Sequence, residues 1–190
     1  DDIELERWIP DASRYFADVN HLAYTSRREF PFVSMPRLNL INNDGRNFLA
    51  ATDQRYDVVI SEPSNPWITG VSNLFTLDHF RAATQSLKRD GIFVQWVQLY
   101  EMSPNNIKSI YRTFATVFPH VRVFAADAYS SDTIMLGSFS PIPLDPAAID
   151  RQLENPTVRE AIDPAHVVGS TDLLARMLLE RDAPIRLAEI

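Results

Sequence analysis

The loop at residues 61–67, with the sequence SEPSNPW, carries the most chemically suggestive side chains of the chain. Glu62 directly follows the apolar run YDVVI, which predicts a buried strand, and Pro63 and Pro66 fix the φ angle of the loop. A carboxylate that a rigid loop holds at a strand end can act as a general base or bind a cation. Asn65 can accept a hydrogen bond from an ammonium group but carries no charge. The simpler interpretation of Glu62 is an exposed acid at a sheet edge.

Two further acids stand near the ends of predicted strands. Ligands of open parallel sheets bind outside the carboxyl ends of the strands, and an acid at the end of the second strand accepts hydrogen bonds from ribose hydroxyls. Glu4, in IELE, occupies such a position, although a solvated carboxylate is the simpler interpretation. Asp44, in NNDGR, precedes a short predicted helix, so local sequence favours a cap or turn residue over a ligand contact.

An amide and two aromatic residues complete the candidate site. Gln95 and Trp96 are neighbours in the predicted strand IFVQWVQL, so one faces the ligand crevice and the other faces the covering helices. Trp67 and Tyr100 follow strands and could line a substrate pocket. Aromatic residues beside a sheet more often belong to the core, so both keep a packing interpretation as well.

The apolar periodicity predicts strands and helices that alternate along the chain. Predicted strands cover 2–5, 37–41, 56–62, 92–99, 121–126 and 132–138, and predicted helices cover 10–20, 46–52, 76–91, 103–120 and 170–182. This alternation favours an α/β fold with a mostly parallel sheet and helices on both faces. The last two strands are joined by a short turn and would form a C-terminal antiparallel hairpin at the sheet edge.

A change of composition near residue 140 predicts the domain organisation. Prolines at 141, 143, 146, 156 and 164 break the following chain into short pieces, of which 170–182 is the convincing helix. We therefore expect an α/β domain over 1–140 and a Pro-rich helical appendage over 141–190. The chain begins with DDIELE, already in a predicted strand and without Met, so we interpret it as a piece of a longer protein, incomplete at its N-terminus.

The composition argues against several classes of function. A net charge of -7 and a pI near 5.0 disfavour a nucleic-acid partner, which would require clustered Lys and Arg. The absence of cysteine excludes a disulfide framework, a thiolate metal site and a Cys nucleophile. Four dispersed histidines make a metal site unexpected. The sequence holds no apolar run of about 20 residues and no signal peptide. A cytoplasmic location is expected, either as a separate protein or as the cytoplasmic domain of a membrane protein.

Residues 56–96, YDVVISEPSNPWITGVSNLFTLDHFRAATQSLKRDGIFVQW, resemble the central segment of spermidine synthase-like proteins, the polyamine aminopropyltransferases. The resemblance extends upstream through NDGRNFL and IELE, so that it covers residues 1–138, and it is strongest for the branch often fused to membrane segments. It implies a class I methyltransferase-like (Rossmann-like) fold. It also implies transfer of an aminopropyl group from decarboxylated S-adenosylmethionine, a co-substrate that is not covalently bound, to a diamine.

The resemblance also implies roles for single residues. Glu4 would hold the ribose hydroxyls and Asp44 would contact the adenine amino group. Glu62 and Asn65 match the two acids of the family's D-S-x-D-P loop, of which the first is the general base. Gln95 would lie near the amine pocket, and members of the family often form homodimers.

The chain departs from the family pattern in two ways. Asn65 replaces an acid, which bears on diamine specificity and on the reaction itself. The Gly-rich loop that lets the backbone approach the co-substrate has no counterpart among the glycines at 45, 70, 91, 137 and 169. We therefore expect this chain alone to be inactive. Two alternatives stay open: a methyltransferase that uses S-adenosylmethionine, and a non-catalytic binding or scaffold domain that retains the fold.

Overall fold

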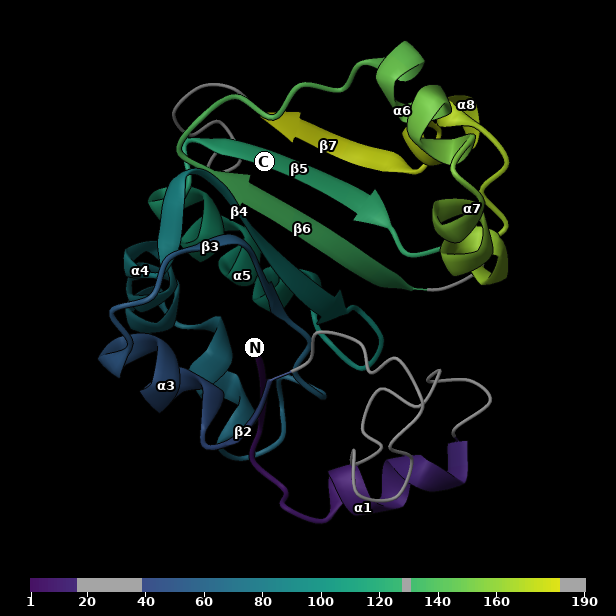
Figure 1. The fold of residues 1–190 in the computed structure, drawn as a ribbon. Coiled ribbons are helices and arrows are strands. Elements are labelled where there is room, and N and C mark those ends of the chain that lie inside the picture. The colour runs from purple at the N-terminus through teal and green to yellow at the C-terminus, as the bar shows by residue number, and fades with distance from the viewer. Residues whose placement is uncertain (17–38, 128–130, 182–190) are drawn as a thin grey trace. The chain divides into compact units, whose positions relative to one another are not determined.

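The computed structural model describes residues 1–16, 39–127 and 131–181, which belong to two compact units, Asp1–Asp53 and Gln54–Ile190 (Figure 1). The predicted boundary near residue 140 falls inside the second unit. No helix within these described ranges combines the length and the apolar character needed to cross a membrane. Nor does any group of three or more His, Asp or Glu side chains gather there as metal ligands would.

The first unit contains a two-stranded parallel sheet and short helices. Its elements are β1 (Asp2–Glu4), α1 (Ile9–Ser13), the 3-10 helix η1 (Arg14–Phe16), β2 (Leu40–Asn42) and α3 (Gly45–Ala51). The strand expected over 2–5 and the helix expected over 46–52 are thereby confirmed. The strand expected over 37–41 is present from Leu40, and residues 37 and 38 lie outside the described residues. The predicted helix over 10–20 is present through residue 16, and its remainder lies outside the described residues.

The second unit is built on a five-stranded mixed sheet in the order β3-β4-β6-β5-β7 (Figure 1). Its strands are β3 (Tyr56–Ser61), β4 (Leu87–Gln98), β5 (His120–Ala125), β6 (Asp132–Ser138) and β7 (Met177–Arg181). β3 and β4 are parallel, and the other pairs are antiparallel, so this sheet is mixed, whereas a mostly parallel sheet was expected. The predicted hairpin forms as β5 and β6. It does not lie at the edge, because β6 inserts between β4 and β5 and the edges are β3 and β7.

A cluster of phenylalanine rings joins helices α4 (Leu77–Gln85) and α5 (Pro104–Val117) to the sheet. Phe80 of α4, Phe93 of β4, and Phe114 and Phe118 at the end of α5 are all fully buried. Ring centroids lie 5.1 Å apart for Phe80 and Phe114 and 4.7 Å apart for Phe114 and Phe118. Both helices therefore cover the face of the sheet that carries Phe93. Rings of this size supply much of the apolar burial that holds a domain together.

The end of α4 corrects one prediction. The helix expected over 76–91 begins after the cap residue Thr76 as predicted, but it ends at Gln85, and Leu87 already belongs to β4. Lys88 lies in the strand and pairs with Asp57 of β3 at 2.7 Å. A Cβ atom at Gly91 would lie 3.0 Å from the Tyr56 carbonyl oxygen, so this glycine permits close approach of two strands instead of ending a helix.

The structure of the C-terminal region differs from the helix predicted over 170–182. It contains α6 (Pro146–Leu153), α7 (Pro156–Ile162), the 3-10 helix η3 (Asp163–Ala165) and α8 (Ser170–Leu174), but Met177–Arg181 forms strand β7, paired with β5. The prediction of a helix over 170–182 is wrong beyond Leu174. Apolar residues in this segment fit either period, and a tertiary contact favours the strand: the buried Arg122 of β5 pairs with Glu180 at 2.9 Å.

Candidate functional site

Glu4 ends β1, and a backbone N–H contacts its carboxylate. Its Oε1 accepts a hydrogen bond from the backbone N–H of Glu6 at 2.8 Å, and its carbonyl oxygen accepts one from the N–H of Asn43 at 3.1 Å. The second contact places Glu4 beside the residues that follow β2. The carboxyl ends of these two parallel strands therefore bring Glu4 and Asp44 to the same edge of the small sheet.

Asp44 caps the helix that follows it. Its Oδ1 accepts a hydrogen bond from the backbone N–H of Asn47 at 3.0 Å, in the geometry of an N-cap. The capping role that the local sequence favoured is therefore confirmed. A ligand contact is a separate matter, because a carboxylate has a second oxygen and further lone pairs.

Glu62 lies at the start of a loop whose two prolines, Pro63 and Pro66, are packed in the protein interior. Pro63 and Pro66 are buried, whereas Glu62 between β3 and Pro63 is exposed. The side-chain amide of Gln98, at the end of β4, donates to the Pro63 carbonyl oxygen at 3.5 Å. The Glu62 carboxylate itself makes no hydrogen bond or ion pair with any residue in the described ranges. A fixed backbone thus carries a carboxylate that is available to a ligand.

Asn65 lies within the same loop, and its backbone is also tied down. Its carbonyl oxygen accepts a hydrogen bond from the N–H of Ile68 at 3.0 Å, which closes a turn around Pro66 and Trp67. The side chain is partly exposed. The structure therefore places Asn65 between Glu62 and Trp67, in a loop whose path is set by backbone contacts.

Gln95 is the buried member of the Gln95–Trp96 pair. It is fully buried, on the same side of β4 as Phe93, and it pairs in register with Ser61, the residue before Glu62. Its Nε2 donates to the Trp96 carbonyl oxygen at 3.1 Å, and its Oε1 has no hydrogen-bond partner among the described residues. Gln95 is thus the residue that faces the covering helices, and it retains one buried acceptor.

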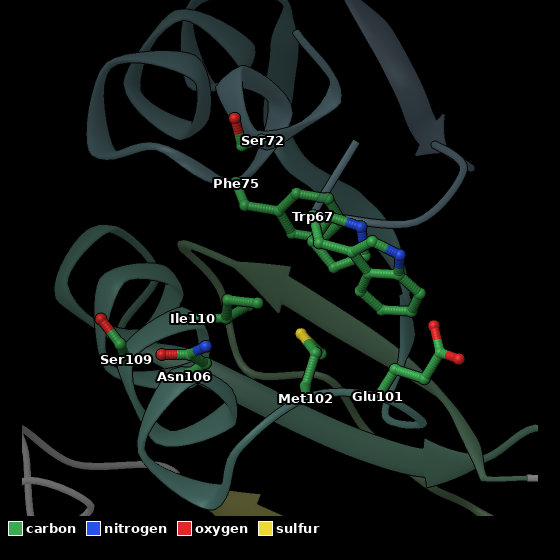
Figure 2. A pocket seen from close by; sticks show the side chains of 9 residues that line it. Trp67, Ser72, Phe75, Glu101, Met102, Asn106, Ser109 and Ile110 are labelled. Carbon is green, nitrogen blue, oxygen red and sulfur yellow. The ribbon is translucent and has the colours of Figure 1, made fainter. Parts of the chain in front are cut away.

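Trp67 and Tyr100 come together at the carboxyl end of the β3–β4 pair. Their ring centroids are 5.4 Å apart with an edge-to-face angle of 77°. Trp67 also lines a pocket of about 270 Å³, here called the Trp67 pocket (Figure 2). The pocket is lined by Pro66, Trp67, Ser72, Phe75, Glu101, Met102, Asn106, Ser109 and Ile110. Its walls come from the loop after β3, from η2 (Val71–Phe75), from the turn between β4 and α5, and from the first half of α5.

Glu101 is the pocket residue that the sequence analysis missed. It lies between β4 and α5 and has a φ of 57°, in the left-handed region that residues other than glycine rarely adopt. The rule that selected Glu62, an acid just beyond the carboxyl end of a parallel strand, would also have selected Glu101. Its position in a pocket depends on the path of the turn, which the local sequence does not reveal.

The comparisons with known proteins decide the family. The family model described as the spermine/spermidine synthase domain matches residues 11–144 of this chain.

The chain belongs to the spermine/spermidine synthase family.

Relatives with curated names agree with this membership in the family. The chain is 27% identical over 154 residues to a polyamine aminopropyltransferase of Clostridium perfringens, covering 79% of this chain and 50% of that protein. It is 26% identical over 123 residues to a polyamine aminopropyltransferase of Thermococcus onnurineus, covering 65% of this chain and 40% of that protein. The chain therefore spans about half the length, or less, of these relatives of the spermine/spermidine synthase family.

Solved structures show the same fold. A crystal structure of spermidine synthase in complex with the transition state analogue AdoDATO superposes with a TM-score of 0.70 at 20% identity, over 93% of this chain and 57% of that one. Human methyltransferase-like protein 13 in complex with SAH superposes with a TM-score of 0.50 at 14% identity, over 73% and 70%. The expectation of an α/β fold of the methyltransferase-like, Rossmann-like kind is thereby confirmed for this member of the spermine/spermidine synthase family.

Proposed function

We propose that this chain forms the catalytic core of an aminopropyltransferase, which transfers an aminopropyl group from decarboxylated S-adenosylmethionine to a diamine. The observation that carries the proposal is the Glu62 loop: an exposed carboxylate, without a partner among the described residues, stands between β3 and two buried prolines. The names of the relatives and membership in the spermine/spermidine synthase family support the same activity.

Glu62 is the general base of this proposal. An alkylammonium group resembles that of Lys, whose unperturbed pKa is about 10.4, so the acceptor arrives protonated and has no free lone pair. The Glu62 carboxylate attracts the cation and takes its proton. The amine nitrogen then attacks the methylene carbon beside the sulfonium. A C–N bond forms, the C–S bond breaks, and methylthioadenosine leaves. Alignment of the two reactants supplies much of the remaining acceleration.

Residues of the first unit would hold the nucleoside half of the co-substrate. Glu4 would accept hydrogen bonds from the ribose hydroxyls, and Asp44 would contact the adenine amino group while its other oxygen caps α3. The complex of a related spermidine synthase with AdoDATO supports a co-substrate of this class. None of the five glycines forms a Gly-rich loop, so we expect tight nucleoside binding to require residues beyond these 190.

Residues of the second unit would hold the amine. Trp67 and Tyr100 would offer their rings to a cation, and Gln95, which is fully buried on the side of the covering helices, would lie near the amine pocket without touching the amine. Asn65 would accept a hydrogen bond from the amine without adding charge.

We also propose that the complete protein belongs to the branch fused to membrane segments, that this part faces the cytoplasm, and that it forms a homodimer.

The test measures formation of the reaction products by the complete protein and by this 190-residue chain alone. Each is incubated with decarboxylated S-adenosylmethionine and a panel of diamines, and methylthioadenosine is measured by mass spectrometry. We expect the complete protein to release it with an equimolar aminopropylated amine, and we expect Glu62→Gln to abolish release. S-adenosylhomocysteine formed from S-adenosylmethionine would instead identify a methyltransferase. No product from either co-substrate would leave a non-catalytic fold, the alternative that Asn65 favours.

Asp44 can be tested separately because its two roles respond differently to substitution. Asn also caps helices, so Asp44→Asn should keep α3 and reduce binding of the nucleoside by the complete protein. Asp44→Ala should lose the cap as well, at a cost of about 1 kcal/mol. Thermal unfolding and equilibrium dialysis of methylthioadenosine measure the two effects. If Asp44→Asn binds the nucleoside as tightly as the wild type, Asp44 is a cap alone.

A further inference from the structure

The Trp67 pocket contains one formal charge, and that charge is negative. Of its nine lining residues, Glu101 is acidic and none is basic. The Glu101 carboxylate makes no ion pair or hydrogen bond with another described residue. In the view of Figure 2, this carboxylate lies at the Trp67 end of the pocket, and Asn106 and Ser109 lie at the other end. An unpaired carboxylate in a pocket that is also lined by an indole ring favours a cation over an anion or a neutral ligand.

The floor of the pocket is apolar. The side chains of Phe75, Met102 and Ile110 lie between its charged end and its polar end (Figure 2). A short methylene chain can lie along such side chains while its nitrogen reaches the carboxylate. The volume of about 270 Å³ is near the lower end of ligand pockets, which suits a small aliphatic molecule.

The aromatic groups add a second attraction for a cation. Trp67 meets Tyr100 edge to face, with ring centroids 5.4 Å apart, and it also lines the pocket. Indole is the side chain that attracts cations most strongly through its ring face. Glu101 is held at a φ of 57°, and strained backbone of this kind concentrates at ligand sites.

We propose that the Trp67 pocket binds an alkylammonium group of the acceptor amine and that Glu101 is its counter-ion. The inference rests on the proposed function for the identity of the ligand as an acceptor. It assigns to Glu101 the negative charge that Asn65 cannot supply. Pro66, which directly follows Asn65, lines the same pocket as Glu101. The second negative charge would therefore come from the turn after β4 instead of the loop after β3. The diamine would then have one nitrogen at Glu101 and the other free to react.

One feature of the pocket argues for a different ligand. The pocket includes Asn106 at the start of α5, whose backbone N–H is capped by Ser103. The positive end of a helix dipole favours anions. The cap occupies one of the free N–H groups, and no basic side chain assists, so the negative charge of Glu101 should dominate. An anion is therefore the competing ligand in the test.

The test compares two variants that differ in charge alone. Asp and Asn are similar in size and both tolerate a positive φ, so Glu101→Asp and Glu101→Asn should both fold. Calorimetric titration of the 190-residue chain with 1,4-diaminobutane at low salt should give at least about tenfold weaker binding for Glu101→Asn than for Glu101→Asp. Glu154→Gln removes an exposed carboxylate at the end of α6 and should bind like the wild type. Trp67→Leu should also weaken binding.

The outcomes separate this inference from the proposed function, because the readout is binding and needs no turnover. Equal affinities of Glu101→Asn and Glu101→Asp would overturn the inference, as would no binding of the diamine to the wild type at millimolar concentration. Tighter binding of succinate than of the diamine would also overturn it. If binding depends on the charge at residue 101 but the complete protein releases no methylthioadenosine, the pocket is a cation site and the aminopropyltransferase proposal fails.

Discussion

At the residue scale, the feature that bears most on the chemistry is the position of negative charge near the loop after β3. Glu62 carries a carboxylate there and Asn65 carries none. The strand-end rule found Glu62 because an apolar run followed by an acid and two prolines is a local pattern. The same rule could not show that Gln95 would be buried, because alternation leaves open which face the helices cover. Nor could it place Glu101 in a pocket, because that depends on a turn and on Trp67.

A substitution at residue 65 tests whether a second negative charge in this loop would strengthen amine binding. Asn65→Asp restores a carboxylate three residues after Glu62, and a charged hydrogen bond to an ammonium is roughly twice as strong as a neutral one. The KM of the complete protein for the diamine should fall by about tenfold, with a smaller change in kcat. Steady-state kinetics at fixed co-substrate measure both. An unchanged KM would show that the side chain of residue 65 does not face the amine.

Tyr111 gives a prediction on pH dependence. Burial raises the pKa of Tyr111 above its usual value near 10, and its hydroxyl hydrogen-bonds with that of Thr133 at 2.9 Å. The pKa of Tyr111 is higher in the folded protein than in the unfolded one. The contribution of its neutral hydroxyl to stability is therefore complete below about pH 10 and is lost as the pH rises further. Tyr111→Phe should cost about 0.5–1.5 kcal/mol at neutral pH. Urea unfolding should show that this difference shrinks near pH 11. A difference that grows with pH would contradict the assignment.

At the element scale, packing of α5 against β6 leaves no space at Gly137. A Cβ atom there would lie 2.5 Å from Cγ of Phe118 and 2.7 Å from Cε1 of Phe114, both rings of the core. Gly137→Ala should therefore lower the free energy of unfolding by about 1–3 kcal/mol. Gly45→Ala is the matched control, since no atom lies within 4 Å of its added Cβ. Urea denaturation checks both, and equal effects would mean that the rings move aside at little cost.

Local sequence predicted elements best where a cap and an apolar face agreed. Ser103 and Pro104 begin α5 as expected, and its buried face carries Phe114. The failures lie at 86–91 and 177–181, where the residue pattern fits a helix or a strand equally well. There the choice is made by partners far along the chain, Tyr56 in one case and Arg122 in the other.

At the scale of the whole molecule, the C-terminal region is part of the sheet of the second unit. The guanidinium of Arg122 is buried between β5 and β7, where it pairs with Glu180 and donates to the carbonyl oxygen of Arg181 at 3.3 Å. The ion pair between the buried Arg122 guanidinium and the Glu180 carboxylate therefore helps to hold strand β7 against β5.

Removing that partner should loosen the edge. Glu180→Gln leaves the Arg122 charge without its carboxylate and should cost about 1–2 kcal/mol, less than a fully buried pair because Glu180 is half exposed. Hydrogen exchange should accelerate most for the amides that join β5 and β7. Glu154→Gln serves as the control. Exchange that is unchanged in β7 would show that main-chain pairing alone holds the strand.

Glu62 is proposed as the base of an aminopropyl transfer. The most direct measurement is methylthioadenosine release by the complete protein with decarboxylated S-adenosylmethionine and a diamine, comparing wild type with Glu62→Gln. We predict release with a matching aminopropylated amine in the wild type and none above background in the variant, with unchanged thermal stability. Equal release from both proteins would contradict the role of Glu62, and no release from the wild type would contradict the activity itself.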